Sequence, residues 1–150
     1  MRLAVIGSRG LSVSVVDVLL ELQAVGVQLS DIELIISGGA VGVDFVANEL
    51  SDTLGVPLRV FVPDYTRDGH RAPFIRNNDI IKHSDFVLAF WDGESRGTAY
   101  TLKVAVNRGI PCKIIRISSH PQLSLFWELT DHILKRGNLL WKWKILVKKQ

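Results

Sequence analysis

The fold of this chain is decided by the stretch ELIISGGAVGVD, which covers Glu33–Asp44. An apolar run ends at the adjacent glycines Gly38 and Gly39, and apolar residues then resume at helical spacing. This pattern predicts a strand, a tight turn, and a helix that begins where the turn ends. Glycine lets main-chain N–H groups face an anion above the start of such a helix, so the turn is a candidate phosphate site. The alternative is a turn in which glycine serves only to change direction.

Strand and helix patterns alternate from Arg2 to Leu134. Phe86–Thr98 and Leu3–Gly10 repeat the design of an apolar strand followed by a glycine loop. The tail Gly137–Gln150 receives no assignment, and Asp64–His70 is predicted to be a mobile polar loop. The sequence predicts strands at Arg2–Ile6, Ile32–Ile36, Leu58–Val62, Asp85–Trp91 and Cys112–Ile117, and helices at Ser12–Val25, Val43–Leu54, around Phe74–Ile81, Thr98–Asn107 and Leu123–Leu134.

This alternation predicts an α/β fold, because strands joined through helices pair in parallel and place helices on both faces of the sheet. We expect a Rossmann-like three-layer α/β/α arrangement with a mainly parallel five-stranded sheet in the order 3-2-1-4-5, plus a C-terminal helix and tail. The glycine loops all follow strands, so they should meet at the carboxyl edge of the sheet, where ligands bind in such folds. Residues 1–117 are expected to form the Rossmann-like domain, with residues 118–150 packed on it as a helix and a basic, aromatic tail.

The composition is that of a globular protein of one domain. The 150 residues are 47% hydrophobic and 22% charged, with a net charge of +3. No apolar run reaches membrane-spanning length and no signal-peptide pattern opens the chain, so we expect a cytoplasmic protein without membrane contact. Much of the basic excess lies near the C-terminus, which makes the body of the domain a poor nucleic-acid surface. The single cysteine, Cys112, falls in a predicted strand and is expected to be a buried, inert thiol.

Four motifs together carry a family resemblance. They are Gly7-Ser8-Arg9, Ser37-Gly38-Gly39-Ala40 with Gly42 and Asp44, Arg76-Asn77, and Asp92-Gly93 with Ser95-Arg96-Gly97-Thr98. Residues 1–117 resemble the SLOG superfamily of Rossmann-like domains, which is related to DprA and to the LOG phosphoribohydrolases, and the pattern is most similar to the YspA-like group. The resemblance implies a nucleotide or nucleotide-derived ligand at the carboxyl edge of the sheet. It also implies two other activities found on this fold, N-glycosidic cleavage and the single-stranded DNA binding of DprA.

Backbone donors are expected from two of these motifs. Gly38–Ala40 would offer N–H groups at one helix start and Gly97–Thr98 at another, so that two helix dipoles meet one anion. Asp44 is expected to cap its helix rather than to catalyse. The candidate ligand-binding residues are Gly7, Ser8, Arg9, Ser37, Gly38, Gly39, Ala40, Asp44, Arg76, Asn77, Asp92, Gly93, Ser95, Arg96, Gly97 and Thr98.

Two arginines are the strongest side-chain candidates. Arg9 would hold a phosphate in a bidentate fork, and the alternative is an exposed, solubilising arginine. Arg76 lies in an apolar helical pattern, and together with Asn77 it matches the ligand-facing pair of the family. The alternative for Arg76 is a structural ion pair with Asp79 or Asp85.

The carboxylates available for catalysis depart from the family pattern. Relatives that cleave N-glycosidic bonds carry a glutamate one helical turn after their Gly-Thr pair, and this chain has Thr101 there. Asp92 and Glu94 lie in the same loop and are the candidate catalytic residues of a hydrolase. The leading hypothesis is a binding or sensing module for a small nucleotide-like ligand, such as ADP-ribose, with no required cofactor. The alternatives are a phosphoribohydrolase-like enzyme and DprA-like binding of single-stranded DNA, which the charge distribution disfavours.

Metal and assembly are the remaining questions. The four histidines show no metal-ligand spacing with cysteines or carboxylates, so no metal site is predicted. A homodimer formed through helices is the candidate assembly.

Overall fold

The computed structural model describes residues 1–39, 42–117 and 147–149. Strands and helices alternate through these residues, as the apolar periodicities predict. In chain order the elements are β1 (Arg2–Gly7), α1 (Val15–Ala24), the 3-10 helix η1 (Leu29–Asp31), β2 (Leu34–Ser37), α2 (Val43–Leu54), β3 (Leu58–Val60), α3 (Tyr65–Asp68), the 3-10 helix η2 (Gly69–Arg71), α4 (Ala72–Lys82), β4 (Phe86–Trp91), α5 (Arg96–Asn107), β5 (Cys112–Arg116) and β6 (Val147–Lys149).

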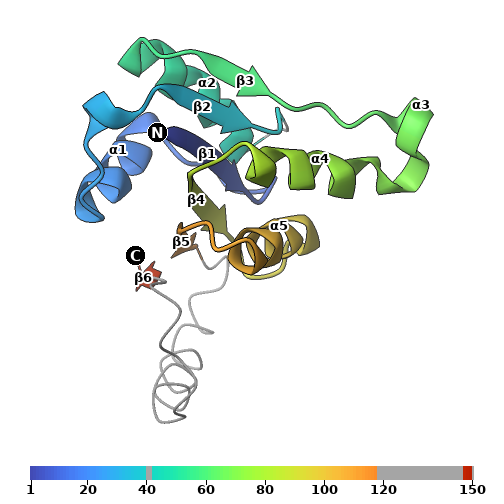
Figure 1. Ribbon diagram of the computed structural model, residues 1–150. Coiled ribbons are helices and arrows are strands. Elements are labelled where there is room, and N and C mark those ends of the chain that lie inside the picture. Colours follow the sequence, from blue (N-terminus) through green and yellow to red (C-terminus); the bar gives the residue numbers. More distant parts are fainter. Residues whose placement is uncertain (40–41, 118–146, 150) are drawn as a thin grey trace.

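The described strands form one parallel sheet in the order β3-β2-β1-β4-β5-β6. The predicted order 3-2-1-4-5 is confirmed for the first five strands. The predicted sheet lacks β6, which comes from the unassigned tail and lies beside β5 (Figure 1). At the centre, β1 pairs with both β2 and β4, and Gly7 lies opposite Phe90. The strand order reverses between β1 and β4, which is where ligands bind in doubly wound sheets.

Helices cover both faces of the sheet, which confirms the three-layer arrangement (Figure 1). On one face, Leu22 of α1 and Leu50 of α2 belong to the same buried cluster as Leu3 of β1. On the other face, Ile81 of α4 packs in a second cluster with Ala4 of β1. Successive residues of β1 therefore serve opposite cores, because side chains alternate along a strand. None of the helices in the described residues is long and apolar enough to cross a membrane.

Helix α1 begins three residues later than predicted. Ser14 is its N-cap, and the Ser14 hydroxyl accepts a hydrogen bond from the Asp17 N–H at 3.2 Å. The Asp17 carboxylate in turn accepts the Ser14 N–H at 2.9 Å. This reciprocal capping box satisfies the N–H groups of Ser14 and Asp17 and fixes the helix start after Ser14, whereas the predicted helix begins at Ser12.

The prediction of a loop at Asp64–His70 is wrong. This segment holds the short helix α3 and the start of η2. The Asp64 carboxylate accepts a hydrogen bond from the Arg67 N–H at 2.9 Å, which caps α3. A run of polar residues resembles a loop in its composition, but an aspartate three residues before a free N–H also favours a helical turn.

A buried ion pair joins α1 to β5. The Lys113 ammonium lies 3.2 Å from a carboxylate oxygen of Glu21, and both side chains are more than nine-tenths buried. Burial of two charges is tolerated when they face one another, because each offsets the lost hydration of the other. The sequence pattern does not single out this pair.

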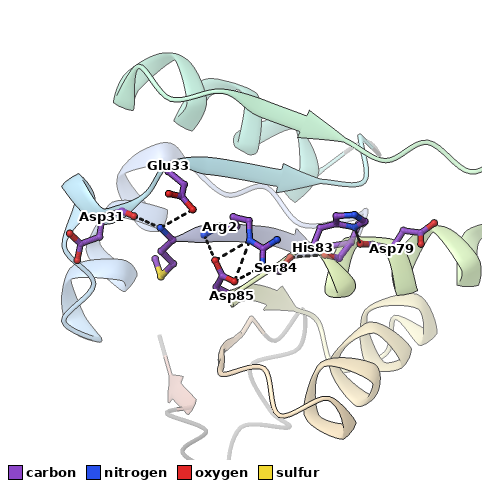
Figure 2. Close-up of polar contacts among 9 residues, drawn as sticks. Arg2, Asp31, Glu33, Asp79, His83, Ser84 and Asp85 are labelled. Atoms are coloured by element: carbon purple, nitrogen blue, oxygen red, sulfur yellow. Dashed lines mark hydrogen bonds and ion pairs between the residues drawn. The ribbon is translucent and has the colours of Figure 1, made fainter.

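Polar contacts also tie together the amino-terminal edge of the sheet (Figure 2). The guanidinium of Arg2 donates to the Asp85 carboxylate at 2.6 Å, and the N-terminal ammonium lies 3.3 Å from Glu33. Hydrogen bonds from the Arg2 side chain and backbone lower the pKa of Asp85 to about 2. Asp85, one of the two acidic partners considered for Arg76, is thus engaged at the edge opposite to the glycine loops.

Candidate functional site

The loops that follow β1 and β4 are joined at the carboxyl edge of the sheet. The Ser8 N–H donates to the Phe90 carbonyl at 3.0 Å, and the Ser8 hydroxyl accepts the Asp92 N–H at 3.2 Å. Ser8 is only 1% exposed. This predicted ligand residue therefore sits beneath the surface and positions the two loops that carry other motif residues.

A first cleft of about 430 Å³ opens between these loops and the helices α4 and α5. It contains residues from three of the four sequence motifs. The lining residues are Ile6, Gly7, Arg9, Gly10, Pro73, Arg76, Asn77, Ile80, Asp92, Ser95, Arg96, Gly97, Thr98 and Thr101. Its volume lies in the range of small-molecule sites.

The start of α5 forms one wall of the first cleft. Ser95 is the N-cap, and its hydroxyl accepts hydrogen bonds from the N–H and the hydroxyl of Thr98. One carboxylate oxygen of Asp92 accepts the backbone N–H groups of Glu94 and Ser95, each at 2.8 Å. Burial raises the pKa of Asp92, but these two hydrogen bonds and the Ser8 hydroxyl outweigh it and hold the pKa below its usual value. Asp92 is therefore ionised at neutral pH and already organises the loop.

The charges around the first cleft favour an anion. Arg9, Arg76 and Arg96 line it together with the carboxylate of Asp92. Arginine presents planar N–H donors that match phosphate oxygens, and the positive end of the α5 dipole adds to their field. The cleft is thus net positive where the helix begins.

Two adjacent residues of α4 reach the first cleft in different ways. Arg76 is half-buried and lines the cleft directly. Asn77 is 8% exposed, and its amide nitrogen lies 3.5 Å from the Gly97 carbonyl in α5. The predicted Arg-Asn pair is therefore placed against the start of α5, where Arg76 lines the cleft and the Asn77 amide bridges the two helices.

A second cleft of about 710 Å³ lies on the other side of the loop after β1. The sequence predicts that the starts of α2 and α5 share one anion, but the two starts line different clefts. Gly39 is in the second cleft, and its N–H donates to the Ser37 hydroxyl at 3.3 Å. The lining residues are Arg9, Gly10, Leu11, Ser12, Val13, Gly39, Gly42, Phe45, Val46 and Glu49.

Gly42 holds the two sides of the second cleft together. It is the N-cap of α2 with a φ of +95°, and a Cβ there would lie 2.6 Å from the Arg9 carbonyl oxygen. Only glycine permits both this backbone conformation and this approach. The start of α2 is therefore packed directly on the backbone of Arg9, which lines both clefts.

Several predicted residues lie outside both clefts. Ser37 and Gly38 are buried, and Glu94 is exposed without lining either cleft. Gly93 packs against the guanidinium of Arg116, which also lies over the Trp91 ring at 5.4 Å. Ala40 and the side chain of Asp44 are outside the described residues, as is the predicted helix Leu123–Leu134.

Some residues that line the clefts are not among those that the sequence motifs predict. Phe45 is 64% exposed and lines the second cleft. A signal for it exists in the sequence, because Phe45 falls off the apolar stripe that Val43, Val46 and Leu50 form along α2. Glu49 lines the same cleft. Groups of three or more histidine, cysteine or acidic side chains that could hold a metal ion are not found in the described part of the chain.

Comparisons with known proteins agree with this fold. No protein-family model matches the sequence, and curated protein sequences give no significant match. The fold is similar to that of DNA processing protein A. The DprA structure from Streptococcus pneumoniae matches with a TM-score of 0.61 and 20% identity, covering 91% of this chain and 56% of that chain. The present chain thus spans little more than half the length of that DprA.

A second DprA structure supports the same conclusion. DprA from Helicobacter pylori, whose structure concerns its single-stranded DNA binding mode, matches with a TM-score of 0.56 and 17% identity, covering 90% of this chain and 80% of that chain. At such identities the similarity concerns the arrangement of strands and helices. It agrees with the DprA-related, Rossmann-like fold that the motifs predict.

Proposed function

We propose that this chain binds a nucleotide or a nucleotide-derived phosphate compound at the carboxyl edge of its sheet, as a binding or sensing module. The observation that carries the proposal is the first cleft, where Arg9, Arg76 and Arg96 gather at the start of α5. The carboxylate of Asp92 in this cleft is already hydrogen-bonded to the backbone. A phosphate placed there would meet arginine forks and a helix N-terminus together.

Fold and motifs both favour a nucleotide over other anions. The motifs resemble those of a superfamily with nucleotide-derived ligands, and the solved structures that match are DprA proteins. The cleft also lies at the point where the strand order reverses between β1 and β4. Doubly wound sheets bind nucleotides at this place because the loops from the two central strands diverge there.

Calorimetric titration with AMP, ADP, ADP-ribose and pyrophosphate tests the proposal. Arg96→Gln and Arg76→Gln should each weaken binding of the phosphate compounds by about 10- to 100-fold, the usual effect of losing a hydrogen bond to a charged group. Arg108→Gln is the matched control, because Arg108 is exposed at the other end of α5 and carries the same charge. Equal affinities in all three variants, or no binding by the parent protein, would refute the proposal.

Single-stranded DNA is the second candidate ligand, favoured by the similarity to DprA and by the arginines of the first cleft. Binding to several DNA phosphates releases counterions, so affinity for an oligothymidine should fall steeply with added salt. We expect only weak binding at low salt, through the basic tail. Deletion of Asn138–Gln150 would also remove β6, so Lys142→Gln/Lys144→Gln is the cleaner variant. Tight, salt-dependent oligonucleotide binding that Arg76→Gln abolishes and the tail variant retains would instead favour the DprA-like function.

Hydrolysis of an N-glycosidic bond is less well supported. Such a reaction needs a carboxylate near the ribose carbon, to stabilise developing positive charge or to activate water. One Asp92 oxygen is engaged by two N–H groups, Glu94 is outside the cleft, and the Thr101 hydroxyl donates to the Gly97 carbonyl at 2.8 Å. Incubation with AMP, ADP-ribose and NAD should release no free base above a protein-free control. Release that Asp92→Asn abolishes would establish an enzyme instead.

A further inference from the structure

The second cleft has no role in the function proposed above, although it adjoins the first. The two clefts share Arg9 and Gly10, so a ligand in one can continue into the other over the loop that follows β1. We propose that the second cleft holds the base of the nucleotide, stacked on Phe45, while its phosphates lie in the first cleft. This inference rests on the proposed function and specifies the ligand as a nucleoside diphosphate or a related compound.

Phe45 is placed as a stacking platform. It lies in the first turn of α2, between residues that are buried: Val43 is 0% exposed and Val46 is 4% exposed. Phe45 itself is 64% exposed and faces the cleft instead of the core. A large aromatic side chain left in water is unfavourable, and a planar base laid on its ring would remove apolar surface from water on both partners.

The charges assign the two parts of the ligand to the two clefts. In the first cleft, Arg76 and Arg96 accompany Arg9, so the phosphates belong there. In the second cleft, the carboxylate of Glu49 accompanies Arg9 and would repel a phosphate. A carboxylate can, however, accept a hydrogen bond from an amino or imino group on the edge of a base.

The backbone between the clefts leaves room for the ligand to cross. Gly42 packs against the Arg9 carbonyl, which fixes α2, and with it Phe45, relative to this loop. At Gly10 the situation is the opposite, since a Cβ there would have no atom of the described residues within 4 Å apart from its chain neighbours. Gly10, one of the two residues that line both clefts, is therefore open where a side chain would project, and a substitution there fills the crossing point without disturbing the core.

Titration with ADP and with pyrophosphate tests the inference, because the two probes differ by the adenosine. Phe45→Ala should weaken ADP binding by about 5- to 100-fold, the loss expected for one base–aromatic stack, and leave pyrophosphate binding within about twofold. Phe45→Tyr should retain ADP binding. Gly10→Val should weaken ADP binding more than pyrophosphate binding. Phe74→Ala is the control, because Phe74 is an exposed aromatic residue on α4 that lines neither cleft.

The outcomes separate this inference from the proposed function. If the parent protein binds neither ADP nor pyrophosphate, the proposed function and the present inference are both refuted. If it binds pyrophosphate and ADP, but Phe45→Ala and Gly10→Val leave both affinities unchanged, the phosphate site stands and the base site is refuted. A loss of ADP affinity in Phe74→Ala, without a loss in Phe45→Ala, would place the base on α4 and also overturn the inference.

Discussion

The buried ion pair between Lys113 and Glu21 allows a quantitative prediction about stability. Their charged atoms lie 3.2 Å apart, and the two side chains are 4% and 8% exposed. Lys113→Met would leave the Glu21 carboxylate buried without its partner, and Glu21→Leu would do the same to the ammonium. Removal of one member of a buried pair typically costs about 3–5 kcal/mol, because the remaining charge has lost both water and its counterion. The double variant replaces both charges by apolar groups of similar size and should recover most of this loss.

Urea denaturation followed by circular dichroism measures these effects. With a slope of about 2 kcal/mol per M, each single variant should lower the unfolding midpoint by about 2 M. The difference between the double variant and the sum of the singles then gives the coupling energy. Arg67→Gln is the control, because the Arg67–Asp68 pair is exposed on the arginine side and should not measurably shift the midpoint. Single variants as stable as the parent, or a double variant that loses the full sum of the singles, would refute this reasoning.

Three further predictions concern pH, thiol reactivity and the loops of the site. Arg2 lowers the pKa of Asp85, so the ion pair stabilises the fold above pH 4. The parent should therefore have a higher free energy of unfolding than Asp85→Asn, by up to about 1 kcal/mol after solvent screening. Acid unfolding curves should show that this difference vanishes between pH 4 and pH 2. Burial raises the pKa of Cys112 to about 11, so iodoacetamide should label it only in urea, as mass spectrometry would detect. Ser8→Ala should lower the free energy of unfolding by about 1 kcal/mol, because the Asp92 N–H loses its hydrogen-bond acceptor. Scanning calorimetry should show this as a lower melting temperature, and an unchanged melting temperature would contradict the prediction.

The order of elements could be predicted because it depends on local patterns. Apolar runs marked the strands, and the helix predicted at Val43–Leu54 has these bounds in the structure, where Gly55 follows it as a left-handed C-cap with a φ of +65°. The helix starts that the sequence predicted wrongly depend on hydrogen bonds between a capping side chain and nearby backbone N–H groups. The capping box at Ser14 places the start of α1 later than predicted, and the cap by Asp64 stabilises the short helix α3 where a loop was expected. The strand β6 carries too short and too basic a pattern to be distinguished from a charged tail.

The sequence motifs supply several residues that line the two clefts, but they did not predict that this edge is divided into two clefts. Parallel pairing brings the motif loops to one edge, so a common site for all of them was a reasonable expectation. The loop Ser8–Gly10 divides that edge, because it packs against the start of α2 on one side and joins the β4 loop on the other. Sequence spacing contains no information about which side of a loop faces which helix. Two clefts, rather than one, could therefore be recognised only in three dimensions.

The glycines and the arginines of the motifs perform different tasks. A Cβ at Gly7 would lie 2.6 Å from the Phe90 carbonyl oxygen, so Gly7, like Gly42, permits close packing of the elements around the site. Such glycines are required by the fold whatever the ligand is. The arginines of the first cleft instead place positive charge beside the start of α5, and under the proposed function they select a phosphate-bearing ligand. The glycine pattern therefore predicts the architecture, while in the proposals made above the choice of ligand rests on Arg9, Arg76 and the aromatic ring of Phe45.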